Sequence, residues 1–132
     1  MHRIHFVRLS ALSWAIVTGI LLTLPGGSFS SSSRLIPFLT AAGMDKVVHF
    51  VLFSVMAWLA YLAFRDVDAL RFPVPAACGF ALAYGLILEG LQFYIPERFP
   101  SFADVLADGV GVLVAGVVIN QVERRRNCSS SK

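Results

Sequence analysis

The stretch GLILEGLQFYIPERFPSFADVLAD, residues 85–108, joins the end of one long apolar run to the start of the next. Its first part is compatible with lipid, but polar and charged side chains then follow at short intervals: Glu89, Gln92, Glu97, Arg98, Asp104 and Asp108. An ionised group near the middle of a bilayer costs roughly 3 kcal/mol or more. These residues therefore need either partners inside the protein or a functional reason to be there.

The composition of the whole chain indicates a membrane protein. Of its 132 residues, 57% are hydrophobic and only 14% are charged, whereas a soluble domain has about 45–50% apolar and about 25% charged residues. A chain of this length cannot bury so much apolar surface in one soluble core, because small domains bury a smaller fraction of their surface. Lipid can cover the excess.

Four apolar runs are long enough to cross a bilayer as helices, which takes about 20 residues each. They are residues 6–24, 47–64, 73–95 and 105–122. Transmembrane strands would alternate apolar and polar residues, whereas these runs are apolar on every side. The sequence therefore predicts an all-α polytopic membrane protein, a bundle of about four transmembrane helices. We expect one domain over residues 1–132, with a short basic tail at residues 123–132.

The distribution of basic residues predicts the orientation, because cytoplasmic loops carry an excess of Lys and Arg. With a cytoplasmic N-terminus, three basic residues lie on the outer side, namely Arg34, Lys46 and Arg98. The other eight lie on the inner side: Arg3, Arg8, Arg65, Arg71, Arg124, Arg125, Arg126 and Lys132. We therefore expect a multi-pass protein of the bacterial cytoplasmic (inner) membrane with both termini in the cytoplasm. If the first run is instead a cleaved signal peptide, which its basic start permits, the later helices keep this orientation.

The cysteines argue against a protein held together by a disulfide, and the net charge does not indicate a nucleic-acid-binding protein. Cys78 lies within the third apolar run and Cys128 in the predicted cytoplasmic tail, so we expect no structural disulfide between them. The net charge of +3 comes from basic residues at inner helix ends, which suit anionic lipid headgroups. The expected partner is thus membrane lipid, and no nucleic acid.

In this topology the unusual polar residues gather at the outer ends of three helices. The candidate ligand pocket consists of Asp45, Lys46, His49, Glu89, Gln92, Arg98, Asp104 and Asp108. Residues three or four apart share a helix face, so the polar rows of the three helices should face one another. Together with Glu97 the cluster has five acids against two basic residues, so a proton, a cation or a positive group of a ligand must complete it.

Each of these residues also has a structural interpretation. Acids at helix starts can stabilise the N-terminus, and long basic side chains can extend to the interface. His49 can be a hydrogen-bonded interior histidine. Glu89 and Gln92 lie away from any helix start, so their structural alternative is an interhelical hydrogen bond. A histidine among carboxylates can also bind a metal, but these residues are scattered and no H-x-x-x-H spacing occurs, so no metal or other cofactor is expected.

Two long stretches resemble the VanZ-like family of bacterial integral membrane proteins. They are MDKVVHFVLFSVMAWLAYLAF, residues 44–64, and YGLILEGLQFYIPERFPSFADVLADGVGVLVAG, residues 84–116. The family pattern runs D-K-x-x-H-F, then E-x-x-Q, then P-x-R-x-x-S-x-x-D-x-x-x-N-x-x-G. It falls on Asp45, Lys46, His49, Glu89, Gln92, Pro96, Arg98, Ser101, Asp104 and Gly111. Asp108 stands where the family usually has asparagine.

The resemblance implies a role in the cell envelope without giving a reaction. The founding member of the family is associated with low-level resistance to the glycopeptide teicoplanin, and the biochemical activity of the family is largely undefined. The predicted orientation agrees with this, because it opens the polar cluster outward, where wall precursors and envelope lipids lie.

Four functions remain open from the sequence. The favoured one is binding of a lipid-linked or amphiphilic ligand at the outer leaflet. The second is an enzyme in which His49 and Glu89 or Asp108 act as general acid and base on an envelope lipid. The third is a transport unit or proton relay, against which the inner halves of the helices are apolar apart from Ser, Thr and Asn120. The fourth is a helix-packing partner of a larger complex.

Overall fold

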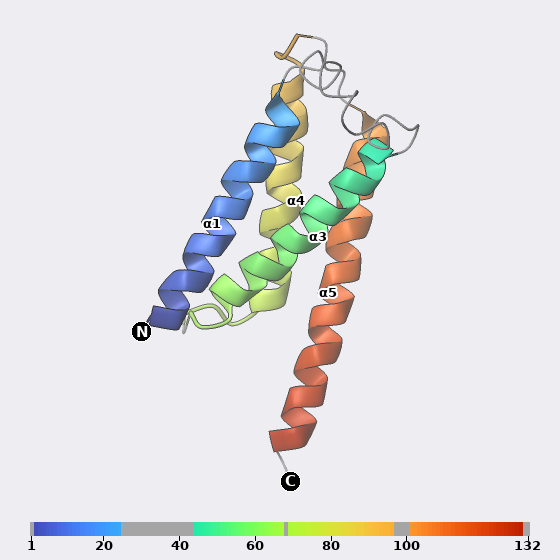
Figure 1. The fold of residues 1–132 in the computed structure, drawn as a ribbon. Helices are drawn as coiled ribbons and strands as arrows, with labels where there is room; N and C mark the ends of the chain where they lie inside the picture. The colour runs from blue at the N-terminus through green and yellow to red at the C-terminus, as the bar shows by residue number, and fades with distance from the viewer. Residues whose placement is uncertain (1, 25–43, 68, 97–100, 131–132) are drawn as a thin grey trace.

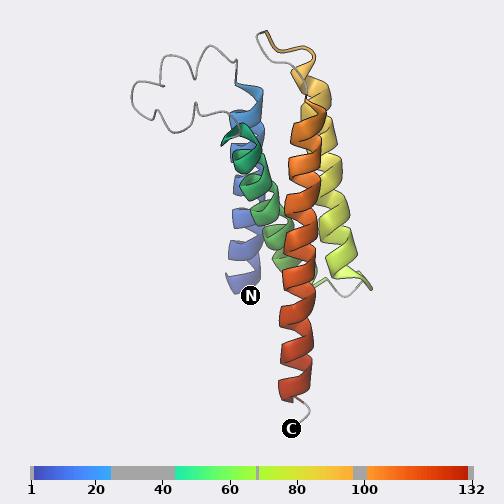
Figure 2. The ribbon, with the colours of Figure 1, turned by 90° about the vertical axis from the view of Figure 1, so that its right-hand side faces the viewer.

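The structure, a computed structural model, describes residues 2–24, 44–67, 69–96 and 101–130. These residues form four helices and no strand: α1 (His2–Thr23), α3 (Met44–Phe64), α4 (Pro73–Gln92) and α5 (Phe102–Ser130). Successive helices run in opposite directions, so the N- and C-terminal ends lie at the same end of the bundle (Figure 1, Figure 2). The predicted all-α bundle is confirmed.

All four helices are long and apolar enough to cross a membrane. Large apolar side chains also point away from the bundle, among them Leu86, Ile87 and Leu113, each at least 60% exposed. In a soluble protein so much exposed apolar surface would cause association, whereas lipid tails cover it in a bilayer. The chain is therefore a multi-pass membrane protein.

At their C-terminal ends, two helices differ by three residues or more from their apolar runs. α4 ends at Gln92, and the backbone N–H groups of Tyr94 and Ile95 each bond to a carbonyl three residues earlier, which makes a turn before Pro96. α5 continues beyond residue 122 through the predicted basic tail to Ser130, because Glu and Arg favour helix as strongly as many apolar residues. Hydropathy locates the membrane segment, whereas helix propensity extends the helix beyond it.

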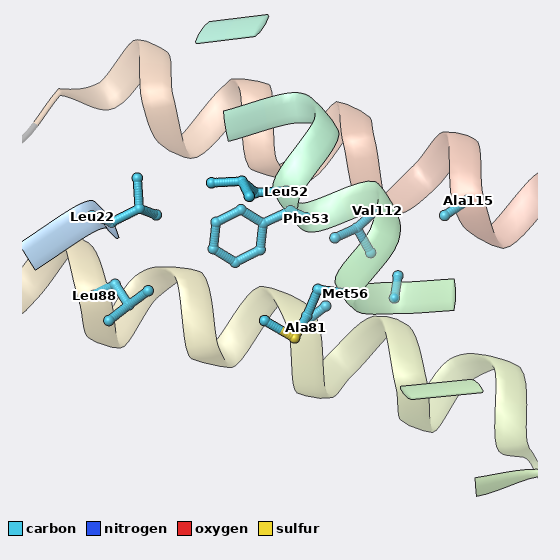
Figure 3. Close-up of a cluster of buried hydrophobic side chains, with 9 residues drawn as sticks. Leu22, Leu52, Phe53, Met56, Ala81, Leu88, Val112 and Ala115 are labelled. Atoms are coloured by element: carbon cyan, nitrogen blue, oxygen red, sulfur yellow. The ribbon is translucent and has the colours of Figure 1, made fainter. Parts of the chain in front are cut away.

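Helix α3 is the centre of the bundle, since it contacts each of the other three helices and contacts α5 most extensively. Its Phe53 is fully buried. Figure 3 shows Phe53 among apolar side chains from the other helices, such as Leu22 of α1, Leu88 of α4 and Val112 of α5. Burying an aromatic side chain contributes about 1.5–3 kcal/mol relative to leaving it in water, although in a bilayer the gain comes from close packing instead.

Helices α3 and α5 approach each other backbone to backbone at Gly111. A Cβ atom on Gly111 would collide with the backbone carbonyl oxygen of Phe50. Ser54 Oγ lies 2.7 Å from that same oxygen and 3.0 Å from the carbonyl oxygen of Gly111. Small residues at membrane helix contacts allow such close approach. This contact fixes the level at which the polar residues of α3 and α5 meet.

Helix α1 is joined to the other helices through side-chain hydrogen bonds to backbone carbonyls. Trp14 Nε1 donates to the carbonyl oxygen of Leu52 at 3.1 Å, and Tyr84 Oη donates to that of Ala15 at 2.7 Å. Interhelical bonds of this kind contribute about 0.6–2 kcal/mol each in a membrane. They hold α1 against α3 and α4, although its own outer face is largely exposed.

Candidate functional site

The predicted polar residues gather at the end of the bundle opposite the chain termini. At this end α3 begins with Asp45 in its first turn, α4 ends just after Glu89, and α5 begins with Asp104 in its first turn (Figure 1). Five polar side chains are at least nine-tenths buried there: His49, Glu89, Gln92, Asp104 and Asp108. A polar layer thus lies inside the end of an otherwise apolar bundle.

A buried histidine–carboxylate pair connects α3 to α5. Nδ1 of His49 lies 2.9 Å from Oδ1 of Asp108, and the two side chains are only 1% and 5% exposed. The ring of Phe53, one helical turn further along α3, stacks at 6.4 Å from the imidazole and closes the apolar side of the pair. If Nδ1 donates its proton to Asp108, Nε2 remains as an acceptor. Nε2 is buried and has no hydrogen-bond partner among the described residues.

The carboxylate of Glu89 is only half satisfied. Its Oε2 accepts a hydrogen bond from the backbone N–H of Ser101 at 3.3 Å. Its Oε1 is buried and bonds to no group in the part of the chain that the structure describes. A buried polar atom without a partner costs about 1–3 kcal/mol, and more if it is charged. Among the described residues, Glu89 therefore has one oxygen without a partner, which could bind another group.

An ion pair links the first turns of α3 and α5. Lys46 Nζ lies 3.7 Å from Oδ1 of Asp104, with the lysine side chain about half exposed and the aspartate buried. This distance is too long for a hydrogen bond, so Asp104 Oδ1 has an electrostatic partner only. Asp45 is exposed. Both acids also lie in the first turns of their helices, which agrees with their predicted role at helix N-termini.

Gln92 has a partner outside the acidic cluster. Its side chain is 2% exposed, and its Nε2 donates to the backbone carbonyl oxygen of Leu22 at 3.2 Å. Leu22 belongs to α1, so this bond joins the upper ends of α1 and α4. The structural alternative considered for Gln92, an interhelical hydrogen bond, is what the structure contains.

Glycine provides the space for the buried carboxylates on the α4 side. A Cβ atom at Gly85 would lie 3.1 Å from Oδ2 of Asp108 and 3.1 Å from the ring of Phe53. Gly85 is one turn before Glu89 on the same face of α4. The absence of a side chain here lets Asp108 lie between α4 and α5 without displacing Phe53.

The structure thus brings together most of the predicted pocket residues and adds two more. Asp45, Lys46, His49, Glu89, Asp104 and Asp108 lie together, whereas Arg98 and Glu97 are outside the described residues. The pocket predicted from the sequence did not include Phe53 or the backbone N–H of Ser101, although Ser101 matches the family pattern. The spacing of four residues between His49 and Phe53 could have indicated the first, because such residues share a helix face.

The same residues are closer to a metal-ligand arrangement than their sequence spacing indicates. One ligand atom from each of His49, Glu89 and Asp108 lies within 4.8 Å of the others. The same is true of Asp45, His49 and Asp104. Three helices supply these atoms, so no short motif could have shown that they meet.

A separate apolar cavity of about 320 Å³ lies towards the other end of the bundle. It is bounded by α1, α3 and α4, through residues such as Leu12, Ala60 and Phe80, and Arg8 lies at its edge. It does not include the polar cluster. Its lining suits an acyl chain or a hydrophobic side chain.

Comparison with known proteins identifies the family. No curated protein and no solved structure shows a significant match to the chain. The model of the VanZ/LLP1 family matches residues 5–122, which include all of the polar cluster and most of each helix. The match extends well beyond residues 44–116, over which the resemblance was seen in the sequence. This chain belongs to the VanZ/LLP1 family.

Proposed function

We propose that the polar cluster binds the headgroup of a lipid-linked or amphiphilic ligand at the outer leaflet of the bacterial cytoplasmic membrane. The observation that carries this proposal is the buried Glu89 Oε1, which has no hydrogen-bond partner in the described part of the chain. A ligand that donates a hydrogen bond to this oxygen removes the desolvation penalty. Glu89 is thus the primary contact, and Lys46 and Asp45 provide charged contacts at the exposed rim.

Aromatic residues at the same end support an interfacial position for the cluster. Phe93, Tyr94 and Phe102 are 76%, 86% and 78% exposed, and they lie just after α4 and at the start of α5. Tyrosine is enriched where membrane proteins cross the lipid–water interface. A ligand whose headgroup reaches Glu89 can therefore keep its acyl chains against the apolar faces of α4 and α5.

The distribution of the basic residues supports an outer position for this end. Those near the opposite end include Arg8, Arg65 and the run at residues 124–126, and the positive-inside rule assigns them to the cytoplasm. The ligand would then come from the lipids and wall precursors of the outer leaflet.

A second candidate function is acid–base catalysis on such a lipid. It is favoured by the orientation of His49, whose Nδ1 is held by Asp108 while Nε2 has no hydrogen-bond partner among the described residues. A histidine positioned in this way by a carboxylate can take a proton from a substrate through Nε2. In that case Glu89 would hold the substrate and His49 would be the general base.

The first experiment is lipid analysis of the purified protein. Wild type, Glu89→Gln and Glu123→Gln are purified in mild detergent, and the bound lipids are extracted and identified by mass spectrometry. Glu123 is the matched control, because it accepts a hydrogen bond from Tyr61 near the other end of the bundle at 2.7 Å. We expect one class of polar lipid to be enriched with wild type and with Glu123→Gln. The amount of this lipid should fall at least roughly ten-fold with Glu89→Gln, because this variant loses one charge-assisted hydrogen bond.

Equal recovery of every lipid from wild type and Glu89→Gln would contradict binding through Glu89. A lipid that is recovered with purified His49→Gln but not with wild type would instead identify the substrate of an enzyme. Retained folding of each variant is checked by its elution in size-exclusion chromatography and its melting temperature.

A further inference from the structure

Three buried side chains from three helices lie close enough together to hold a metal ion. His49 of α3, Glu89 of α4 and Asp108 of α5 are 1%, 6% and 4% exposed. One ligand atom from each lies within 4.8 Å of the other two. Three ligand atoms bound at about 2.1 Å to one tetrahedral cation are about 3.4 Å apart. Side-chain shifts of about 1 Å therefore suffice to bring the three atoms into coordination.

Glu89 carries an oxygen that lacks the partner a buried polar atom needs, because its Oε1 has no hydrogen-bond partner among the residues that the structure describes. The ligand nitrogen of His49 is Nδ1, which lies 2.9 Å from Oδ1 of Asp108. A cation bound to both atoms would take the place of the proton between them, because metal ligands must be deprotonated. The ring proton would then be on Nε2.

The charges of the set also favour a cation. Glu89 and Asp108 supply two buried carboxylates, and no lysine or arginine of the described residues lies within ion-pair distance of either one. Lys46 pairs with Asp104 instead. A divalent cation would balance two carboxylates and a neutral imidazole, which removes the cost of leaving buried charges unpaired.

We propose that His49, Glu89 and Asp108 bind one divalent transition-metal cation of the Mn²⁺ to Zn²⁺ series. An imidazole with two carboxylates suits these cations, whereas Mg²⁺ and Ca²⁺ prefer oxygen ligands alone. Three protein ligands leave at least one coordination position for water or for an oxygen of a ligand. This inference does not depend on the proposed lipid ligand, because the cation can bind without it.

A second triad competes for the same histidine. Asp45, His49 and Asp104 also place ligand atoms within 4.8 Å of one another. Asp45 is exposed, however, and Asp104 already has Lys46 as a partner. The positive charge of Lys46 would repel a cation there. The fully buried triad is therefore the assigned site.

The experiment measures metal bound to the full chain, purified in detergent with an affinity tag that contains no histidine. Metal-depleted protein is incubated with Zn²⁺ or Mn²⁺, desalted and analysed by elemental mass spectrometry, and affinities are measured by calorimetry, with Mg²⁺ for comparison. We expect about one Zn²⁺ or Mn²⁺ per chain in wild type, as for a single closed set of ligands. Glu89→Gln and His49→Gln should bind at least roughly ten-fold more weakly, the usual effect of weakening a metal site.

Matched controls come from the same chain. Glu123→Gln and His5→Gln change the same residue types outside the site and should bind as wild type does. Asp45→Asn should also bind the metal normally. If Asp45→Asn loses the metal and Glu89→Gln keeps it, the other triad is the site and the assignment is wrong.

If the variants at the site fail to fold, pulsed electron paramagnetic resonance of Mn²⁺ bound to wild type tests the site without any substitution. Coupling between the Mn²⁺ electron spin and an imidazole nitrogen supports the site. The absence of this coupling overturns the proposal, as does a wild-type protein that binds neither Zn²⁺ nor Mn²⁺.

Discussion

His49 and Asp108 form a direct contact of 2.9 Å between Nδ1 and Oδ1, although they lie 59 residues apart in the chain. They belong to α3 and α5, the two helices with the most extensive contact in the bundle. The pair is therefore both a connection between helices and the centre of the polar cluster. Its two roles can be separated by substitutions that keep or remove its hydrogen bond.

The first prediction concerns the stability of this pair. Asp108→Asn keeps an oxygen that can accept the bond from His49, so we expect a loss of less than about 1.5 kcal/mol in the free energy of unfolding. His49→Phe leaves the Asp108 carboxylate buried without its partner, for which we expect a loss of about 3–5 kcal/mol. The double variant should be more stable than His49→Phe. Unfolding in mixed detergent micelles measures all three, and additive losses would show that the two residues do not interact.

The second prediction concerns the close approach of α3 and α5. Gly111→Ala places a methyl group against the carbonyl oxygen of Phe50, so it should destabilise the protein by about 1–3 kcal/mol. Gly109→Ala is the matched control on the same helix, because a Cβ there meets no atom within 4 Å. It should be neutral or stabilising by up to about 1 kcal/mol, since alanine favours helix over glycine. Melting temperatures in detergent test this, and an equal effect of both substitutions would contradict the packing described.

The third prediction concerns the connection of α1 to α4. Gln92→Leu removes the bond from Gln92 Nε2 to the carbonyl oxygen of Leu22 while keeping a side chain of similar size. We expect a loss of about 0.6–2 kcal/mol, the usual contribution of one interhelical bond in a membrane. Binding of a metal or lipid at Glu89 should change little, because Gln92 faces α1. Loss of ligand binding at unchanged stability would instead return Gln92 to the ligand site.

The fourth prediction concerns orientation. In intact spheroplasts a membrane-impermeant maleimide should label Asp45→Cys, made in a Cys128→Ser background, because Asp45 is exposed at the end of the bundle that we assign to the outside. The exposed Cys128 of the wild-type chain should react only after the membrane is permeabilised. The opposite pattern would place the termini outside and remove the outer-leaflet part of the proposed function.

The sequence was sufficient to predict the fold class and the grouping of the polar residues, because both follow from apolar run length and from helix periodicity. It predicted the helix ends less well. α4 ends three residues before its apolar run does, and α5 extends through residues that are charged but favour helix. Neither feature depends on hydropathy.

The partners within the site could not be predicted, because they depend on how three helices are rotated and shifted against one another. Nothing in the spacing of Gln92 distinguishes a bond to Leu22 from a contact with the acidic cluster. Likewise His49, Glu89 and Asp108 are too far apart in sequence to indicate that their ligand atoms meet.

The most direct test of the central claim, that Glu89 and its neighbours bind an envelope ligand, is a comparison of envelope extracts. A deletion strain carries an empty vector, wild type, Glu89→Gln or Glu123→Gln, and its lipids and wall precursors are compared by mass spectrometry. The account predicts a species that changes on deletion and is restored by wild type and Glu123→Gln but not by Glu89→Gln. Full restoration by Glu89→Gln would contradict it and leave the polar cluster with a structural role only.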